Sequence, residues 1–212
     1  MINLCAAVLL LLSFAMISQR RTVALVDLFT AQGVTLAVST LVVALGTGQR
    51  HMYYSAALTF ALKVIVLPVI LRRLIRRLGV QWEAESRLDV TVTMVIGLLV
   101  VIFAFGLAEP ISALATTVTR STLGIALAVV LLSFLMMITR RKAVSQVIGF
   151  LAMENGLFFA AASATYGMPM LIEFGIALDV LVAVFVLGVF FFQIREQFDS
   201  LDLQHLESLK EK

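Results

Sequence analysis

Apolar stretches, each about as long as a helix that crosses a bilayer, alternate with short polar or basic segments along this chain. The pattern predicts seven membrane-spanning helices and a polar tail, at about residues 2–18, 22–46, 55–78, 88–108, 122–139, 143–165 and 171–192, with the tail at 193–212. Segments that alternate residue by residue between apolar and polar, as in a membrane β-barrel, are not found in the sequence. We therefore expect an all-α integral membrane protein.

Composition points to the same class. Hydrophobic residues make up 61% of the 212 residues, charged residues make up 14%, and the mean hydropathy is +1.06, which is more apolar than a soluble domain of this size needs. The lone Cys5 excludes an internal disulfide and a cysteine metal cluster. The net charge of +3 does not indicate nucleic-acid binding. We expect the lipid bilayer to be the main environment of the chain.

The basic residues predict which side of the membrane each loop occupies. Opposite loops hold Arg50 and Arg120, and Lys63 lies inside the third span. The other thirteen of the sixteen Lys and Arg residues lie at or beyond the ends of the first, third, fifth and seventh spans, namely Arg20, Arg21, Arg72, Arg73, Arg76, Arg77, Arg87, Arg140, Arg141, Lys142, Arg195, Lys210 and Lys212. Cytoplasmic loops carry such an excess of basic residues. We therefore predict that the N-terminus lies outside and that the C-terminus is cytoplasmic.

Two parts of the chain share a weak repeat. Leu11–Phe14 and the pair Arg20-Arg21 both recur about 120 residues later, and Ala61–Val64 is similar to residues 177–180. We predict two parallel three-helix repeats, at residues 1–78 and 122–192, on either side of a linker and fourth helix at 79–121, with a cytoplasmic tail at 193–212. The repeat places Asp179 at the position equivalent to Lys63.

Three ionisable residues are expected near the middle of the membrane. Glu154 lies about eleven residues, or ~16 Å, into span six from the cytoplasmic side. Lys63 and Asp179 lie about eight or nine residues, or ~12–13 Å, into spans three and seven from the outer side. A carboxylate at this depth costs roughly 2.5–3.5 kcal/mol, so such groups face the protein interior and pair. Because burial and pairing oppose each other, these groups can exchange protons near neutral pH, and we interpret them as a candidate proton relay.

A static ion pair that only fixes helix register is the alternative interpretation. A single pair would suffice for register, whereas this set leaves one acid unmatched. Secondary candidates are Asn155, which follows Glu154; Gln32, roughly opposite Asn155 in the repeat; Glu173, near the start of span seven; and Asp27, near the cytoplasmic end of span two, where a helix-end role fits better.

Further features of the sequence concern the backbone of span three and the absence of other chemistry. Pro68 is expected to kink span three and to free backbone carbonyls near Lys63. The sequence holds no nucleophile set, metal-ligand cluster or phosphate-binding loop. We therefore expect no catalytic residue, metal site or cofactor site in this chain.

The segment Met153–Gly156, with Glu173–Asp179 downstream, resembles the component E family of hydrogenase-4, of the formate-hydrogenlyase type. The resemblance covers nearly the whole chain and includes Lys63–Pro68 and Leu201–Leu203. Spans five to seven also resemble the three-helix small subunit of bacterial complex I and the matching subunit of multisubunit cation/proton antiporters. Two buried glutamates serve proton translocation in that wider family. Asp179 falls on the second glutamate, and the first falls on Leu151, one turn before Glu154.

The resemblance implies an accessory subunit, not catalytic by itself, in the membrane arm of a proton-translocating hydrogenase related to complex I. It also implies the inner membrane of a bacterium as the location. Antiporter-like membrane subunits would pack beside it, and a soluble arm would hold the nickel–iron site and the iron–sulfur clusters. A subunit of a cation/proton antiporter and a purely structural membrane scaffold are the alternatives. A neighbouring gene for a nickel-binding subunit would favour the hydrogenase over the antiporter.

Overall fold

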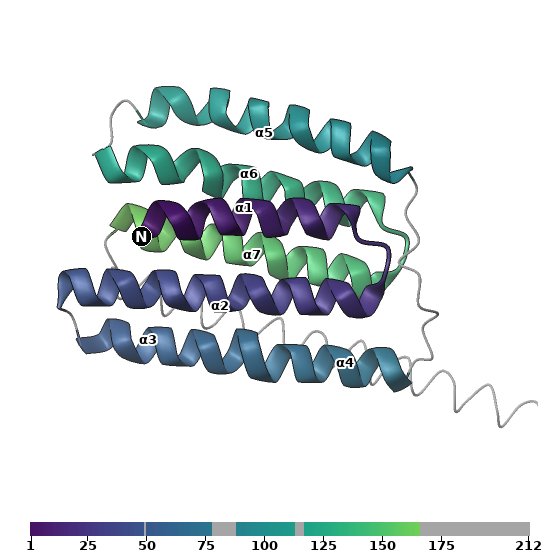
Figure 1. Cartoon of the computed structure of the whole chain (residues 1–212), viewed down its shortest axis with the longest axis horizontal. Helices are drawn as coiled ribbons and strands as arrows, with labels where there is room; N and C mark the ends of the chain where they lie inside the picture. The colour runs from purple at the N-terminus through teal and green to yellow at the C-terminus, as the bar shows by residue number, and fades with distance from the viewer. Residues whose placement is uncertain (49, 78–87, 113–116, 166–212) are drawn as a thin grey trace, which may run out of the picture. The chain divides into compact units, whose positions relative to one another are not determined.

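The computed structural model describes residues 1–48, 50–77, 88–112 and 117–165 (Figure 1). All of them belong to the first of two compact units, Met1–Ala177, and the second unit, Leu178–Lys212, lies outside the described residues. The described residues form seven α-helices and one π-helix, which are α1 (Ile2–Ser18), α2 (Thr22–Thr47), α3 (Arg50–Phe60), η1 (Ala61–Val66), α4 (Leu67–Arg77), α5 (Val90–Ser112), α6 (Thr117–Thr139) and α7 (Ala143–Thr165). The prediction of an all-α protein is confirmed.

Among the described residues, five helical stretches are long and apolar enough to cross a membrane: Thr22–Gly46, Met52–Arg76, Val90–Pro110, Thr122–Thr139 and Ala143–Ala162. The second of these stretches runs through α3, η1 and α4, which follow one another without a break. α1 is apolar but shorter, with 17 residues. The chain is therefore a multi-pass membrane protein. The predicted seventh span, at 171–192, lies outside the described residues, so the count of seven and the repeat stay predictions.

Some helix bounds differ from those that the sequence suggested. α3 begins at Arg50 and α6 at Thr117, each about five residues earlier than expected. α5 was expected to end before Pro110 but continues to Ser112, because a proline this close to a helix end disturbs only the last turn. Gly48 caps the C-terminus of α2; its φ of 68° is left-handed, and its N–H donates to the Ala44 carbonyl at 2.9 Å. A glycine suits this helix cap because it has no side chain to strain the left-handed backbone.

Hydroxyl groups within the spans bond to their own helices. Ser13, Thr30, Thr35, Thr40 and Ser133 each donate to the carbonyl four residues earlier, over 2.7–3.0 Å. A hydroxyl in hydrocarbon has no water to bond, so this local acceptor removes most of the cost of burying it. These residues can therefore stand in apolar helices without an external partner.

α1, α2, α6 and α7 pack around one apolar core. Its buried side chains are Ala6 and Leu9 of α1, Leu36 of α2, Ala126 and Val129 of α6, and Phe158, Phe159 and Ala162 of α7. α5 packs on α6 and α1, whereas α3, η1 and α4 pack on α2 (Figure 1). Because α2 contacts both η1 and α7, side chains from these two elements meet beside α2.

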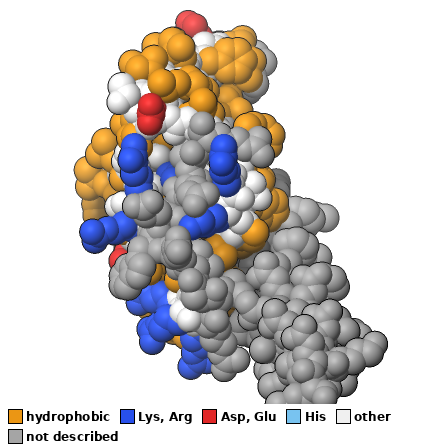
Figure 2. Space-filling view, turned by 90° about the vertical axis from the view of Figure 1, so that its right-hand side faces the viewer, with side chains coloured by type: hydrophobic (Ala, Val, Ile, Leu, Met, Phe, Trp, Pro, Cys, Tyr) orange, Lys and Arg blue, Asp and Glu red, His pale blue; other side chains and the backbone are white. Residues whose placement is uncertain are grey.

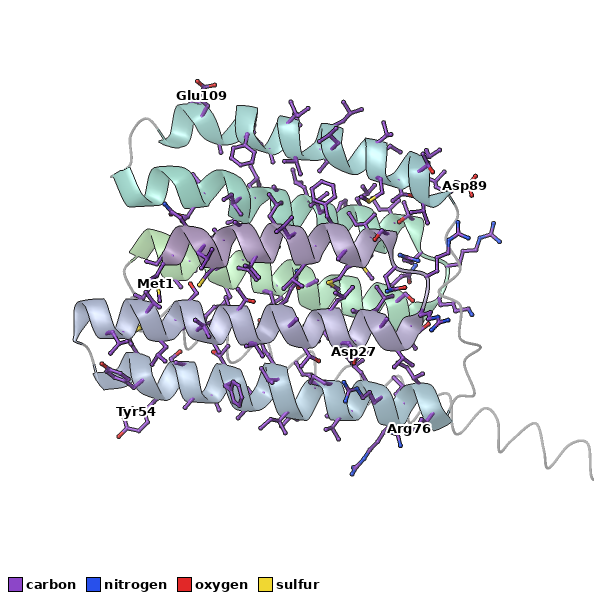
Figure 3. The ribbon with its side chains drawn as sticks, in the orientation of Figure 1. Met1, Asp27, Tyr54, Arg76, Asp89 and Glu109 are labelled. Carbon is purple, nitrogen blue, oxygen red and sulfur yellow. The ribbon has the colours of Figure 1, made fainter. Side chains whose placement is uncertain are left out.

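Consecutive spans run in opposite directions between two ends of this unit (Figure 1). Met1, Tyr54 and Glu109 lie at one end, whereas Arg76 and Asp89 lie at the other (Figure 3). The second end carries the α1–α2 and α6–α7 connections, and Figure 2 shows Lys and Arg side chains gathered there. Within the described residues, the basic side chains are therefore concentrated at one end of the helices, as the sequence indicated.

Candidate functional site

Lys63 lies in the π-helical segment η1 (Ala61–Val66) of span three. The Leu67 N–H donates to the Leu62 carbonyl, five residues earlier, as in a π-helix. Pro68 follows directly and lacks an N–H, so it cannot bond the carbonyl four residues before it. The irregularity expected near Pro68 is thus a π-helical segment, a geometry that recurs at functional sites.

Gly33 of α2 allows η1 to approach closely. A Cβ built at Gly33 would lie 3.1 Å from both the Lys63 Cβ and the Lys63 carbonyl oxygen. Contacts this short leave no room for a larger side chain unless η1 moves. The glycine therefore brings the η1 backbone against α2, directly beside Gln32.

Lys63 and Glu154 form a buried ion pair between η1 and α7. The Lys63 Nζ lies 2.9 Å from the Glu154 Oε1, and the two side chains are 0% and 3% exposed. The ammonium also donates to the Asn155 Oδ1 at 2.8 Å. It lies 5.6 Å from the centroid of the Phe158 ring, which is within the range of a cation–π interaction. One helix, α7, therefore supplies three contacts to the ammonium, through residues 154, 155 and 158.

The polar contacts continue from Asn155 to α1. The Asn155 Nδ2 donates to the Gln32 Oε1 over 3.5 Å, and the Gln32 Nε2 donates to the Ser13 Oγ at 2.9 Å. The Ser13 hydroxyl in turn donates to the Leu9 carbonyl at 2.9 Å. Gln32, Asn155 and Ser13 are all buried. A network of hydrogen bonds thus joins η1, α7, α2 and α1 across the interior of the bundle.

This arrangement is suited to acid–base chemistry rather than to metal binding. A carboxylate and an ammonium 2.9 Å apart can exchange a proton directly, because they already share a hydrogen bond. Leaving either charge buried without its partner costs about 3–5 kcal/mol, so their charge states are coupled. Within the described ranges, no group of three or more His, Cys, Asp or Glu side chains could hold a metal ion.

The structure places the other predicted residues elsewhere or does not describe them. Asp27 of α2 forms an ion pair with Arg72 of α4 at 2.6 Å, and their side chains are 56% and 44% exposed. This is a surface pair near the basic end of the helices, which fits the helix-end role expected for Asp27 (Figure 3). Asp179 and Glu173 lie outside the described residues, so their roles stay predictions.

Sequence reasoning missed the role of Arg140, which it counted with the basic residues of the cytoplasmic side. Arg140 is only 2% exposed, and its guanidinium donates to the carbonyls of Met16, Ile17 and Gln19 at 3.2, 2.8 and 2.6 Å. Burial lowers the pKa of this guanidinium, and Arg20 lowers it further, although an arginine stays protonated in proteins. Arg140 therefore caps the C-terminus of α1 from the end of α6.

Ser13 was also missed as a member of the polar network. The only sequence signal for either residue was the repeat that contains Leu11–Phe14 and Arg20-Arg21. A serine inside an apolar run has no pattern that distinguishes a network member from a hydroxyl bonded to its own helix.

The sequence is similar to those of several known proteins. Uncharacterized protein Rv0085 of Mycobacterium tuberculosis (strain ATCC 25618 / H37Rv) is 32% identical over 212 residues, which is 100% of this chain and 96% of that protein. Hydrogenase-4 component E of Escherichia coli (strain K12) is 26% identical over 162 residues, 76% of this chain and 74% of that protein. This chain belongs to the same family as Rv0085 and is a homologue of hydrogenase-4 component E. Hydrogenase-4 component E of Shigella flexneri matches equally well.

The match at 26% identity confirms the resemblance to hydrogenase-4 component E, on which the expectation of a membrane subunit was based. No protein-family model matches the sequence, and no solved structure matches it.

Proposed function

We propose that this chain is a non-catalytic membrane-arm subunit of a proton-translocating hydrogenase assembly related to complex I, and that Lys63, Glu154 and Asp179 carry protons within it. The buried contact of 2.9 Å between Lys63 and Glu154, inside helices of membrane-spanning length, is the observation that carries the proposal. Homology to hydrogenase-4 component E supports the hydrogenase assembly, because that relative is by its name one component of a hydrogenase.

The buried pair suits a proton path because the charge states of its two side chains are tightly coupled. Opposite charges attract strongly in an interior of low dielectric, so a proton added to Glu154 changes the balance of forces on Lys63 at once. The hydrogen bond that joins the two side chains gives the proton a direct route between them. The pair can therefore accept a proton from one neighbour and give it to another.

Asp179 is the proposed second acid. It lies in the predicted span seven at a depth similar to that of Glu154, and the two spans are joined by a short segment, residues 166–170. Adjacent helices pack about 8–10 Å apart, a distance that one or two waters bridge. In this proposal, protons pass between Glu154 and Asp179, while Lys63 biases which acid is ionised. The redox chemistry takes place in partner subunits.

Partners and orientation form part of the same proposal. We place the basic end of the helices (Figure 2) in the cytoplasm, following the positive-inside rule. α5 has a broadly exposed apolar face, which includes Val95, Leu98, Leu99, Ile102 and Phe103 at 56–62% exposure. Lipid tails and the apolar surfaces of antiporter-like subunits both fit such a face. The nickel–iron site and the iron–sulfur clusters would belong to a soluble arm.

The test replaces each proposed acid with an amide of nearly the same shape. Glu154→Gln and Asp179→Asn keep hydrogen-bonding atoms in place but cannot carry a proton. In the assembled complex, we expect each variant to leave dye-linked hydrogen oxidation close to wild type and to reduce coupled proton translocation sharply. Asp27→Asn is the matched control, because it removes an acid from an exposed pair, and it should translocate protons like wild type.

Two outcomes would count against the proposal. If Glu154→Gln and Asp179→Asn assemble and translocate protons like wild type, the relay is wrong and the pair only holds helices together. If the chain purifies with antiporter-like subunits but never with a nickel-binding subunit, the cation/proton antiporter replaces the hydrogenase.

A further inference from the structure

The buried face of span three, which runs through α3, η1 and α4, changes character at Lys63. From the Tyr54 end of the helices (Figure 3), this face carries Ser55 and Thr59, which are 4% and 2% exposed. After Lys63 it carries apolar side chains that are each at most 6% exposed, namely Leu67, Leu71, Leu74 and Ile75. We propose that water reaches Lys63 from the Tyr54 end, between α2 and α3 along the hydroxyls of Ser55 and Thr59, and that the opposite, basic end of the span stays dry.

The contact between Gly33 and Lys63 fixes the register of α2 against span three, which runs in the opposite direction (Figure 1). A Cβ built at Gly33 would lie 3.1 Å from the Lys63 carbonyl oxygen. Thr40 lies seven residues after Gly33, which is nearly two turns, so it is on the same face of α2 and ~10 Å closer to the Tyr54 end. Ser55 lies ~12 Å from Lys63 in the same direction along α3. Thr40 and Ser55 are therefore at similar levels on the two sides of this interface.

The hydroxyl groups along this interface can bond to water. The Ser55 Oγ is buried, and it has no hydrogen-bond partner in the part of the chain that the structure describes. Thr40 is 0% exposed and donates its hydrogen to the Leu36 carbonyl at 3.0 Å, which leaves its oxygen able to accept a hydrogen bond. A buried hydroxyl without a partner is costly, and an ordered water is a common partner for such a group. Ser55 and Thr59 are one turn apart, about 6 Å along the helix, which is a distance that one water bridges.

A thin apolar layer closes the interface at the Tyr54 end. Met52 is 0% exposed and forms a small core cluster with Val43 and Ala44 of α2. It lies three residues before Ser55, so this layer is only about one turn, or ~4.5 Å, thick. A methionine side chain is unbranched and flexible, so it can move aside without a change in the helix backbone. Met52 is therefore the point at which water enters.

The apolar layer at the basic end is thicker. On span three it extends from Leu67 to Ile75, which is ~12 Å along the helix. On α2, the facing side is closed by Val26, which lies seven residues before Gly33 and so shares its face, and by Phe29, and both are 0% exposed. The described side chains on both sides of the interface thus oppose the entry of water from the basic end.

This inference deepens the proposed function and rests on it for its meaning, because water that reaches Lys63 from one end fixes the end from which the Lys63–Glu154 pair exchanges protons with solvent. With the basic end in the cytoplasm, the Tyr54 end is the outer end. The water path itself is argued from the packing of α2 against span three, so it can be tested without any measurement of proton movement.

Silver ions test the path, because Ag⁺ is close to a water molecule in size and needs water to reach a thiol. The chain has one cysteine, Cys5, so Cys5→Ala gives a background without thiols. Ser55→Cys and Thr59→Cys are introduced into it one at a time, in the full chain in lipid nanodiscs. The rate of silver binding is read as the loss of later maleimide labelling of the unfolded protein. We expect both thiols to react at least ~10-fold faster than those of Leu67→Cys and Leu71→Cys, because the reactive thiolate needs water.

The control positions are matched in burial or in depth. Leu67 and Leu71 are 1% and 0% exposed, so their variants test thiols that are buried as deeply but lie beyond Lys63. Phe60 follows Thr59 at almost the same depth and is 44% exposed, so Phe60→Cys tests whether silver arrives through the lipid, and it should react as slowly as Leu67→Cys. If a leucine variant does not fold, Val26→Cys on the facing side of α2 takes its place.

The entrance at Met52 is tested by combining two substitutions. Met52→Ser replaces the thioether with a small hydroxyl and removes most of the apolar layer at the Tyr54 end. We expect it to increase the rate of silver binding to Thr59→Cys several-fold and to leave the rate at Leu67→Cys unchanged. Circular dichroism of each variant checks that the helical content is that of wild type.

The outcomes separate this inference from the proposed function. Equal rates at Thr59→Cys and Leu67→Cys would overturn it, whether both are fast, as with water from both ends, or both are slow, as with a dry interface. A rate at Thr59→Cys that Met52→Ser does not change would also overturn it. Either result leaves the proton-path proposal standing, because silver binding is read without proton flux. Conversely, a Glu154→Gln complex that translocates protons like wild type removes the proposed function but not the measured water path.

Discussion

Replacing Arg140 with methionine should weaken the attachment of α1 to the rest of the bundle. The Arg140 guanidinium donates to three carbonyls at the end of α1, those of Met16, Ile17 and Gln19. Methionine has a similar length and fills the same buried space without any donor. The three carbonyls would then lose their charged partner at a helix end with few backbone donors, and the Met16 carbonyl would keep only the Gln19 N–H at 3.4 Å.

The expected size of this effect follows from the contacts. A hydrogen bond to a charged group contributes roughly 1.5–3 kcal/mol, and the single Nη2 that makes all three contacts has only two hydrogens. A cation at a helix C-terminus adds roughly 0.3–1 kcal/mol. The cost of burying the arginine offsets part of this sum. We therefore expect Arg140→Met to lower the free energy of unfolding by about 2–3 kcal/mol.

Reversible unfolding in mixed detergent micelles, followed by circular dichroism, measures this free energy. Arg141→Met is the matched control, since Arg141 is the exposed neighbour and loses the same charge. It should stay within about 0.5 kcal/mol of wild type. Arg140→Lys should give a partial loss, because a lysine cannot reproduce the planar fork of donors. Equal stabilities for Arg140→Met and Arg141→Met would refute the capping role.

Other predictions concern packing, the surface pair and topology. Gly33→Leu should lower the free energy of unfolding by about 1–3 kcal/mol or more, because a Cβ there already meets η1 at 3.1 Å, whereas Gly46→Leu, with nothing within 4 Å of its Cβ position, should be tolerated in the same assay. Asp27→Asn should change that free energy by less than about 1 kcal/mol, because its pair with Arg72 is exposed. A reporter fused after Lys212 should be active only in its cytoplasmic form, and activity of a periplasm-only reporter there would reverse the proposed orientation.

The helix positions and the contact between Lys63 and Glu154 are the features of the structure that could be predicted from the sequence. Long apolar runs with basic ends form few structures other than helices in a membrane. The helix positions in the described residues were therefore predictable to within about five residues. The similar depths of Lys63 and Glu154 followed from the rise of 1.5 Å per residue in a helix. Because ionisable groups at that depth pair, a contact between them was the expected arrangement.

The direction and extent of the polar network could not be predicted. The neighbours that the amide oxygen and nitrogen of Gln32 and Asn155 contact depend on how four helical elements rotate and pack. Sequence spacing does not fix that rotation. Arg140 was misleading for a different reason, since a basic residue after a span fits the positive-inside rule whether it is exposed or buried. The close contact between η1 and Gly33 was likewise not predictable, because Gly33 lies about thirty residues earlier in the chain and no local pattern indicates the approach.

The central claim is that the Lys63–Glu154 pair carries protons and does not serve only to hold helices together. Replacing a buried ion pair with neutral groups of similar volume is often neutral or stabilising, whereas removing one partner is costly. The variant with both Lys63→Met and Glu154→Gln therefore tests the two roles separately. The decisive measurement is proton translocation by the assembled complex that carries both substitutions. We expect normal assembly and hydrogen oxidation with proton translocation lost, and translocation at the wild-type level would contradict the account.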